Sequence, residues 1–264
     1  MPPLLDAVIT AGGIPQPDEP LYPLTQGKNK ALLPIGGRPM VQWIVDALTG
    51  ADCIRSLVIV GLSPEDAHLV SAKPISFVPN QGSMIGNAVG GVKDVLARDP
   101  AATHALLVSS DIPTITPAIV TWAVETGLAG DQDICYSIVP AEVMERRFPG
   151  SRRSFFRLKE GRFTGSDMNL FRTSMVNNIH PGWRAIVDAR KNVLKQASLI
   201  GFDTLLLFAL GQLTIARAVR AAQRGLGMRG RAVISPHAEM GMDVDKPHQF
   251  ELVQRDLEAR GVPA

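Results

Sequence analysis

Short apolar runs alternate with longer stretches of helical periodicity through the first half of the chain. These runs and stretches follow one another in the order 4–10, 40–49, 57–61, 75–79, 85–97, 105–109 and 118–127. The shorter runs are apolar at successive positions, which is typical of parallel strands covered by helices on both faces. The pattern predicts an α/β fold with a mostly parallel central sheet.

The regular alternation of short apolar runs and helical stretches ends at about residue 131. The predicted elements of the second half are strands at 134–139, 168–172 and 232–235, mostly helical sequence over 183–224, and a closing helix over 247–260. No linker or repeat divides the chain, and a length of 264 residues lies within the range of about 250–300 that one core can reach. We expect one domain over 1–264, with lobes at about 1–130 and 131–264 and a helical insertion at about 181–229.

Composition and charge exclude several classes of protein. Lys and Arg number 27 and Asp and Glu 25, so the net charge of +2 gives no basic field for nucleic acid. Cys53 and Cys135 lack the spacing of a disulfide framework or a zinc site. The apolar run Leu205–Leu210 is far below the ~18 residues that span a bilayer, and no targeting segment is readable. We expect a cytoplasmic protein without a transmembrane segment.

The loop after the first strand carries the strongest chemical signal. Ala11, Gly12 and Gly13 follow the strand, and Lys28 and Lys30 follow a proline-rich stretch. Paired glycines let backbone N–H groups approach a phosphate, and a nearby lysine supplies a positive charge. The Walker loop and the dinucleotide fingerprint are both absent here. The sequence indicates a phosphate-binding loop, with an ordinary strand-to-helix turn as the alternative.

Asp111 stands just beyond the predicted strand 105–109, in the segment Ser-Asp-Ile-Pro. Ligands of open α/β sheets bind outside the carboxyl ends of the strands, and a carboxylate there can hold Mg²⁺ together with bound phosphates. The alternative is a helix N-cap, although Thr116 before Pro117 is better placed for that task. Asp111 is therefore a candidate metal ligand.

A second acidic pair precedes the last helix. Asp243 and Asp245 lie two residues apart, so in an extended segment both side chains point to the same side. Asp245 could instead cap the helix that begins near Pro247. We therefore expect Asp243 to join Asp111 as a metal ligand, with Asp245 as the lesser candidate.

Several segments together resemble a known superfamily. They are Ala11-Gly12-Gly13, 21–25 (Leu-Tyr-Pro-Leu-Thr), 30–35 (Lys-Ala-Leu-Leu-Pro-Ile) and 38–40 (Arg-Pro-Met). This opening pattern resembles the nucleotidyltransferases, which include sugar-1-phosphate nucleotidyltransferases and molybdenum-cofactor guanylyltransferases. The resemblance implies a glycosyltransferase A-like (nucleotide-diphospho-sugar transferase) fold that binds a nucleoside triphosphate. It also gives Lys30 the position of the family's phosphate-binding lysine.

One departure from that pattern concerns the loop. Where the family usually carries a triphosphate-binding arginine, this chain has Pro20. Lys28 supplies a cation nearby, but a lysine does not reproduce the planar fork of an arginine. The loop therefore departs from the family pattern at a position that would contact the triphosphate.

Two further segments share the resemblance. Segment 80–87 resembles the family's base-recognition element, which points to Gln81 and to the backbone near Gly86 as nucleotide-binding groups. The alternative is a plain glycine-containing loop with a serine cap. Segment 165–170 resembles the element that lines the acceptor pocket, and Asn169 is its candidate acceptor-binding side chain.

The helical insertion carries features that the resemblance does not require. Arg217, Arg220 and Arg224 recur at helical spacing and so share one face, which is either solvated or faces an anionic acceptor or partner. The glycine-rich segment 225–230 ends a helical run, so it reads as a helix stop and not as a dinucleotide motif. The apolar run 205–210 is too continuous to form a single apolar stripe on a helix. At least two sides of that helix should therefore be covered, either by the rest of the chain or by a second copy.

The sequence favours a Mg²⁺-dependent nucleotidyltransferase that moves a nucleoside monophosphate group from a nucleoside triphosphate to a phosphorylated small molecule and releases pyrophosphate. Two alternatives stay open. One is a nucleotide-binding or regulatory module that has lost turnover, which Pro20 and the basic insertion suggest. The other is a nucleotide-sugar glycosyltransferase, which a D-x-D at the end of a central strand would favour; here the D-x-D is late, at 243–245.

Overall fold

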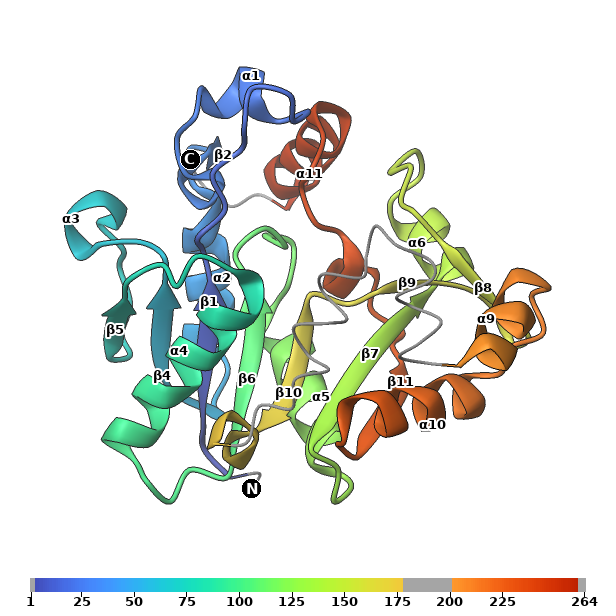
Figure 1. Cartoon of the computed structure of the whole chain (residues 1–264). Coiled ribbons are helices and arrows are strands. Elements are labelled where there is room, and N and C mark those ends of the chain that lie inside the picture. The colour runs from blue at the N-terminus through green and yellow to red at the C-terminus, as the bar shows by residue number, and fades with distance from the viewer. Residues whose placement is uncertain (1–2, 178–200, 261–264) are drawn as a thin grey trace.

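The computed structural model describes residues 3–177 and 201–260, and these residues form one nine-stranded sheet flanked by helices (Figure 1). The strands of this sheet are β1 (Leu5–Thr10), β4 (Ile54–Val60), β5 (Ile75–Val78), β6 (His104–Ser109), β7 (Ile134–Pro140), β8 (Phe156–Leu158), β9 (Gly161–Gly165), β10 (Met168–Arg172) and β11 (Gly230–Ile234). Their order is β5-β4-β1-β6-β10-β7-β9-β8, and β11 pairs with β7. The predicted α/β class is confirmed.

The sheet is parallel in its first half and mixed in its second. β5, β4, β1 and β6 are parallel, β10 runs antiparallel to both β6 and β7, and β11 is parallel to β7. β8, β9 and β7 continue as antiparallel neighbours. Because β10 is reversed, its first residues lie at the edge where β1 and β6 end. This reversal decides which side chains meet at the site.

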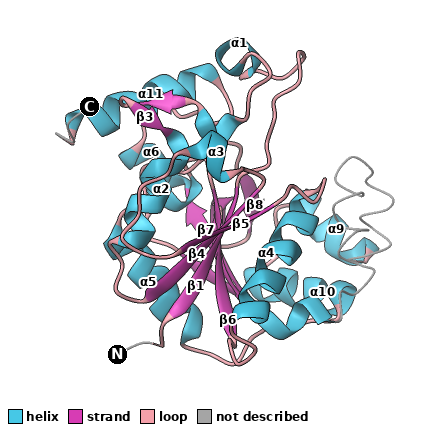
Figure 2. Ribbon diagram, turned by 90° about the vertical axis from the view of Figure 1, so that its left-hand side faces the viewer, coloured by secondary structure: helices cyan, strands magenta, loops and turns pink. Residues whose placement is uncertain are grey.

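Helices cover both faces of the sheet. They are α1 (Tyr22–Thr25), α2 (Met40–Thr49), α3 (Pro64–Ala67), α4 (Met84–Arg98), α5 (Pro117–Leu128), α6 (Ala141–Arg147), α9 (Phe202–Ala209), α10 (Ile215–Leu226) and α11 (Pro247–Ala259), with short 3-10 turns η1 (Lys30–Leu32), η2 (Thr173–Asn177) and η4 (Ala238–Gly241) and a small hairpin of β2 (Pro34–Ile35) and β3 (Arg38–Pro39). Figure 2 shows α2 and α5 on one face of the sheet and α4 on the other. This arrangement explains why the parallel strands are apolar throughout.

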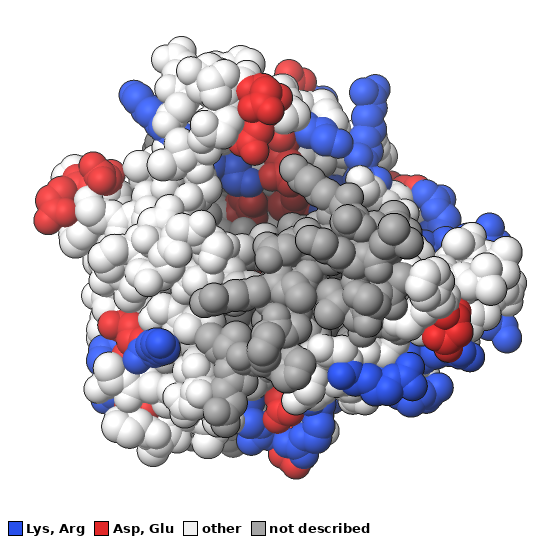
Figure 3. Space-filling view, in the orientation of Figure 1, with Lys and Arg blue, Asp and Glu red and all other residues white. Residues whose placement is uncertain are grey.

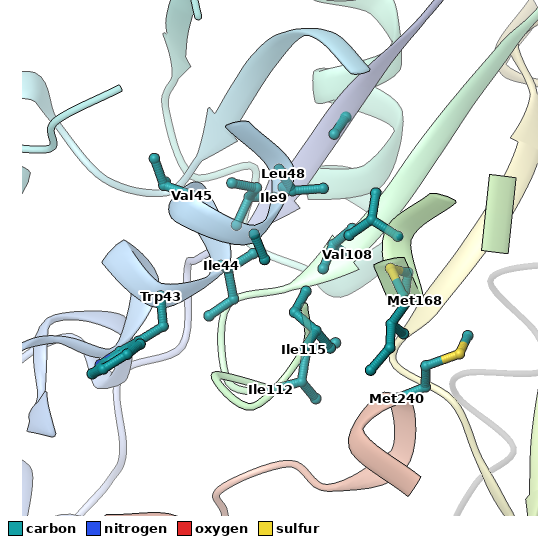
Figure 4. Close-up of a cluster of buried hydrophobic side chains, with 14 of the residues drawn as sticks. Ile9, Trp43, Ile44, Val45, Leu48, Val108, Ile112, Ile115, Met168 and Met240 are labelled. Carbon is teal, nitrogen blue, oxygen red and sulfur yellow. The ribbon is translucent and has the colours of Figure 1, made fainter. Parts of the chain in front are cut away.

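The two faces of β1 belong to two apolar clusters. Ile9 packs with the side chains of α2 and α5, whereas its neighbour Val8 packs under α4. Figure 4 shows the larger cluster, in which Ile9 and Ile44 lie near Val108. Helix α4 approaches β1 so closely that a Cβ added to Gly91 would lie 2.2 Å from Val8 Cγ1. The larger cluster holds the ends of β1 and β6 in fixed positions.

Several predicted boundaries agree with the structure. α2 and β10 occupy their predicted ranges, and Thr116 caps α5 by accepting a hydrogen bond from the backbone N–H of Ile119 at 3.4 Å. Gly227 ends α10 in the left-handed conformation with φ of 63°, which confirms the predicted helix stop. Segment 178–200, which contains most of the first half of the predicted insertion, lies outside the described residues.

The described part of the insertion consists of α9 and α10. Phe202, Leu206 and Leu210 are exposed along α9, so cover by a second copy of the chain stays a prediction. Arg217 of α10 pairs with Asp203 at 2.6 Å. Within residues 3–177 and 201–260, no helix has both the length and the apolar character needed to cross a membrane.

Candidate active site

The loop after β1 is tied to the sheet by one amide side chain. Asn29 donates from Nδ2 to the carbonyl oxygen of Ala11 at 2.6 Å, and its Oδ1 accepts from the backbone N–H of Ala31 at 2.9 Å. The backbone N–H of Lys30 donates to the carbonyl oxygen of Gly13 at 2.8 Å. These bonds anchor Lys30 in η1 beside the carboxyl end of β1. Sequence reasoning missed Asn29, whose only signal is its place between the two lysines.

The ammonium of Lys30 joins two of the candidate acidic residues. Nζ lies 2.6 Å from Oδ2 of Asp111 and 2.7 Å from Oδ1 of Asp245. Burial alone would lower the pKa of Lys30, but the charges and hydrogen bonds of the two carboxylates raise it above its usual range. Lys30 is therefore positively charged at neutral pH and neutralises this end of the cluster.

The backbone brings the late acidic segment against Asp111. The backbone N–H of Val244 donates to the carbonyl oxygen of Asp111 at 3.0 Å, which places Asp243 and Asp245 beside the end of β6. Lys246, and not Asp245, is the N-cap of α11, so the capping alternative for Asp245 is wrong. The physical reason is that the carboxylate of Asp245 accepts a hydrogen bond from Lys30 and does not cap the helix.

Asp243 and Asp245 share their charge unequally. Burial, the charge of Asp167 and a hydrogen bond to Asp245 raise the pKa of Asp243 to about 8. Burial would also raise the pKa of Asp245, but the hydrogen bond from Asp243 and the charge of Lys30 lower it to about 2. Asp243 also forms an ion pair with Arg153. Within the pair, Asp243 therefore holds a proton more readily than Asp245 does.

Two members of the cluster were missed by sequence reasoning. Asp167 precedes β10; its N–H donates to the carbonyl oxygen of Met240 at 2.8 Å, and its carbonyl oxygen accepts from Ser109 at 2.8 Å. Asp167 stands at the start of a strand, where the strand-end rule does not look for ligands. Only the antiparallel direction of β10 brings this start to the edge where β1 and β6 end. Arg153 lies in the irregular loop between α6 and β8, and no local sequence pattern distinguishes it from its neighbours.

The titration of Asp167 gives a test of the cluster. Burial and the charge of Asp111 raise the pKa of Asp167 to about 7. An unfolded Asp titrates near ~3.9, so between these pH values the folded chain keeps a proton that the unfolded chain has lost, and stability falls as pH rises. Asp167→Asn should therefore raise the melting temperature more at pH 8 than at pH 5.

Thermal denaturation at both pH values measures this effect. Asp18→Asn, in the exposed first loop, is the matched control and should give no pH-dependent difference. An equal shift for Asp167→Asn at pH 5 and pH 8 would contradict the raised pKa.

The glycine loop is closely packed on one side and open on the other. A Cβ on Gly12 would lie 2.6 Å from Nδ2 of Asn87, and Asn80 donates to the carbonyl oxygen of Gly12 at 3.2 Å. A Cβ on Gly13, in contrast, would meet nothing within 4 Å. Space for a ligand therefore lies beside Gly13, at the predicted nucleotide-binding loop.

The predicted base-recognition segment follows β5 and begins α4. Gln81 is exposed; its backbone N–H donates to Oδ1 of Asn87 at 2.7 Å and its side chain to the carbonyl oxygen of Pro79 at 2.7 Å. Ser83 caps α4 by accepting from the N–H of Gly86 at 3.0 Å. The serine cap of the alternative interpretation is thus present, and it occupies the N–H of Gly86.

The other candidate residues make no described contact with the acidic cluster. Lys28 is exposed, as is Pro20 in the same loop. Asn169 of β10 accepts from the N–H of Ser137 at 2.9 Å and donates to the carbonyl oxygen of Ser166 at 2.8 Å. The amide of Asn169 therefore links β10 to β7, and it is not in hydrogen-bond contact with the acidic cluster among the described contacts.

The donor set fits a hard cation once phosphates are present. Oδ1 of Asp111 is buried and accepts no hydrogen bond among the described residues. In the same part of the chain, no three His, Cys, Asp or Glu side chains are already arranged around a metal position. Mg²⁺ is commonly held by one or two carboxylates together with substrate phosphates, so two acids suffice. Figure 3 shows acidic and basic side chains meeting in a recess on this face.

The comparisons with known proteins identify the class. The family model of the MobA-like NTP transferase domain matches residues 7–226. The chain therefore belongs to the MobA-like NTP transferase family, a family of nucleotidyltransferases.

A solved structure described as a hypothetical transferase from Thermus thermophilus is 34% identical, with a TM-score of 0.80, over 94% of this chain and 99% of that one. The 2-C-methyl-D-erythritol 4-phosphate cytidylyltransferase of Prochlorococcus marinus is 28% identical over 39% of this chain and 47% of that protein. The chain thus spans less than half of the length of the curated relatives it matches.

A CMP:2-keto-3-deoxy-manno-octonic acid synthetase complexed with CTP is 14% identical, with a TM-score of 0.56 over 98% of this chain and 100% of that one. At this identity the similarity shows the fold alone. The nucleotide-diphospho-sugar transferase fold implied by the sequence resemblance is thereby confirmed.

Proposed function

We propose that the chain transfers a nucleoside monophosphate group from a nucleoside triphosphate to a phosphorylated small-molecule acceptor. In this reaction an oxygen of the acceptor phosphate attacks the α-phosphorus, the bond to the β-phosphate oxygen breaks, and pyrophosphate leaves with the electron pair of that bond. The observation that carries the proposal is the convergence of Lys30, Asp111 and the 243–245 segment beside the glycine loop.

Lys30 is the group we assign to the transferred and leaving phosphates. It is partly buried and positively charged, and Asn29 anchors its turn, so it needs little reorganisation when negative charge develops. Its present partners are carboxylates, so the position already holds a cation next to oxygen anions. The open space beside Gly13 leaves room for the triphosphate, and the exposed Gln81 is available to the base.

Asp111 and Asp243 are the residues we assign to Mg²⁺. When bound, the ion would neutralise phosphate charge and orient the triphosphate for attack. Before that, Asp111 faces Lys30 and Asp243 faces Arg153, so each acid has a protein cation beside it. The chain supplies position and charge, and no protein nucleophile is required.

Asn169 lies on the proposed acceptor side, beyond Asp167 in the same segment. Its bonds to Ser137 and Ser166 hold the start of β10 in place. We therefore propose that Asn169 acts mainly by positioning this wall of the acceptor pocket.

A nucleotide-binding module without turnover is the second candidate. Pro20 in the position of the family's arginine favours it, since Lys28 is exposed and contributes no guanidinium. The D-x-D at 243–245 follows η4 and does not end a central strand, which argues against a nucleotide-sugar glycosyltransferase.

Ligand-induced stabilisation tests the nucleotide proposal. A ligand present at 100 times its Kd stabilises by about 2.7 kcal/mol, which corresponds to a rise in melting temperature of roughly 5–10 °C for a chain of this size. We expect at least one of ATP, GTP, CTP and UTP to give such a rise with Mg²⁺, and a smaller one with EDTA. Lys30→Gln should reduce the rise, and Lys93→Gln on the exposed side of α4 should not. No rise with any of the four would contradict nucleotide binding.

A further inference from the structure

A cavity of about 350 Å³ lies between α4, β6 and β10. Its walls are mainly apolar, with the side chains of Met84, Ile85, Ala88 and Val89 from α4 and Leu107 from β6 among them. Figure 1 shows α4 running across this side of the sheet. The volume falls in the range of about 300–1,000 Å³ that is typical of small-ligand pockets.

The cavity borders the acidic cluster. Thr10, Ser109 and Asp167 all line it, and these residues lie at the edge of the sheet where β1 and β6 end and β10 begins. Asp167 also interacts electrostatically with Asp111 and Asp243. A molecule with its body in the cavity would therefore present one end to the proposed reacting groups.

The polar groups of the described wall are largely engaged. Asn169 bonds to Ser137 and Ser166, as described above. Arg172 pairs with Asp131 at 2.6 Å and with Asp133 at 3.3 Å. The wall therefore offers few hydrogen bonds to a body rich in hydroxyl groups, and it favours burial of hydrocarbon.

The nucleobase has a separate place. Ala11, Gly12, Gly13 and Gln81 carry the proposed nucleotide contacts, and none of these residues is among the described residues that line the cavity. Met84, which is 62% exposed at the first turn of α4, lies between the two regions and lines the cavity. The remaining substrate of the proposed reaction is the acceptor.

We propose, on the basis of the function proposed above, that this cavity holds the apolar body of the acceptor. The acceptor is then a phosphate monoester of a compact aliphatic or alicyclic alcohol, with its hydrocarbon between α4 and β10. Its phosphate lies at the end of the cavity that Asp167 borders, where Lys30 and, when bound, Mg²⁺ would offset the negative charges. The chain selects this acceptor by burial of hydrocarbon and not by reading sugar hydroxyls.

A series of n-alkyl phosphates, from methyl to hexyl phosphate, tests the proposal by titration calorimetry. The full chain is titrated with Mg²⁺ and a saturating, non-hydrolysable analogue of the nucleoside triphosphate that stabilises it most. Each buried methylene should lower Kd about fourfold until the cavity is filled. A Kd independent of alkyl length, with the analogue bound, would overturn the cavity assignment alone.

Ala88→Phe places a ring in the cavity, and Ala97→Phe places the same ring on the exposed side of the same helix. We expect Ala88→Phe to weaken hexyl phosphate binding at least tenfold while methyl phosphate and the nucleotide analogue bind as before, and Ala97→Phe to change none of these. If Ala88→Phe weakens the nucleotide and not the alkyl phosphate, the cavity belongs to the nucleotide and the proposal is wrong.

If Ala88→Phe does not fold, the titration of the parent chain with the alkyl phosphates still tests the cavity assignment. Failure of the parent chain to bind any nucleoside triphosphate would instead contradict the function proposed above. The two failures are therefore distinguishable.

Discussion

Asp111→Asn should abolish Mg²⁺-dependent turnover, with a loss of at least about 10³-fold, while the melting temperature stays close to that of the parent. The amide keeps the size of the carboxylate but loses the charge that compensates a cation. The backbone bond from Val244 to the carbonyl oxygen of Asp111 does not depend on the side chain, so the fold should persist. Steady-state rates with a thermal melt of each variant measure both effects.

The neighbouring acids refine this prediction. Asp243→Asn should cause a similar loss, and Asp245→Asn a smaller one, whereas Asp46→Asn, paired with Arg38 away from the site, is the control. Asp245 accepts a hydrogen bond from Lys30, so Asp245→Asn also weakens one of the contacts that hold the ammonium of Lys30 in place. An essential Asp245 together with a dispensable Asp243 would show that the metal ligand in this segment has been wrongly chosen.

Lys30→Ala should lower kcat by a factor of roughly 10² or more, the order expected when one charge-stabilising group of a transition state is removed. Lys28→Ala should cost less, unless Lys28 has taken over the task of the missing arginine. Lys93→Ala on the exposed side of α4 removes the same charge outside the proposed site and is the control. Rates at saturating nucleotide separate the effect on kcat from weaker binding. Unchanged activity of Lys30→Ala would contradict the assignment of the phosphate-binding lysine.

The fold class was predictable because it follows from local pattern. Continuous apolar strands alternate with helices, and Ile9 and Val8 on opposite faces of β1 confirm that both faces are covered. The reversal of β10 was not predictable, since nothing within Met168–Arg172 encodes its direction. Direction depends on which neighbours the strand finds in the folded sheet.

The same distinction applies to the site. Asp111 directly follows β6, so the rule that ligands bind at carboxyl ends was enough to predict it, whereas Lys30 was predicted from the glycine loop and the family resemblance. The structure brings these two side chains together, and their roles in a reaction stay predictions. Asp167 required knowledge of the antiparallel strand, and Arg153 reaches Asp243 from an irregular loop. Residues placed by long-range topology leave no periodic signal in the sequence.

The basic face of α10 remains a prediction. Arg217 is engaged with Asp203, whereas Arg220 and Arg224 are exposed beside Arg229 and Asp133 around a shallow hollow. A solvated face and a docking face for an anionic partner are both compatible with this arrangement.

The most direct test follows the fate of each phosphate. The chain is incubated with Mg²⁺, a small-molecule phosphate fraction and a nucleoside triphosphate labelled either at the α- or at the γ-phosphorus, and the products are separated. The proposed function predicts that the α label moves into a new acceptor-linked product and that the γ label appears in pyrophosphate. Appearance of the γ label in orthophosphate or in the acceptor, with the α label left in a nucleoside diphosphate, would contradict it.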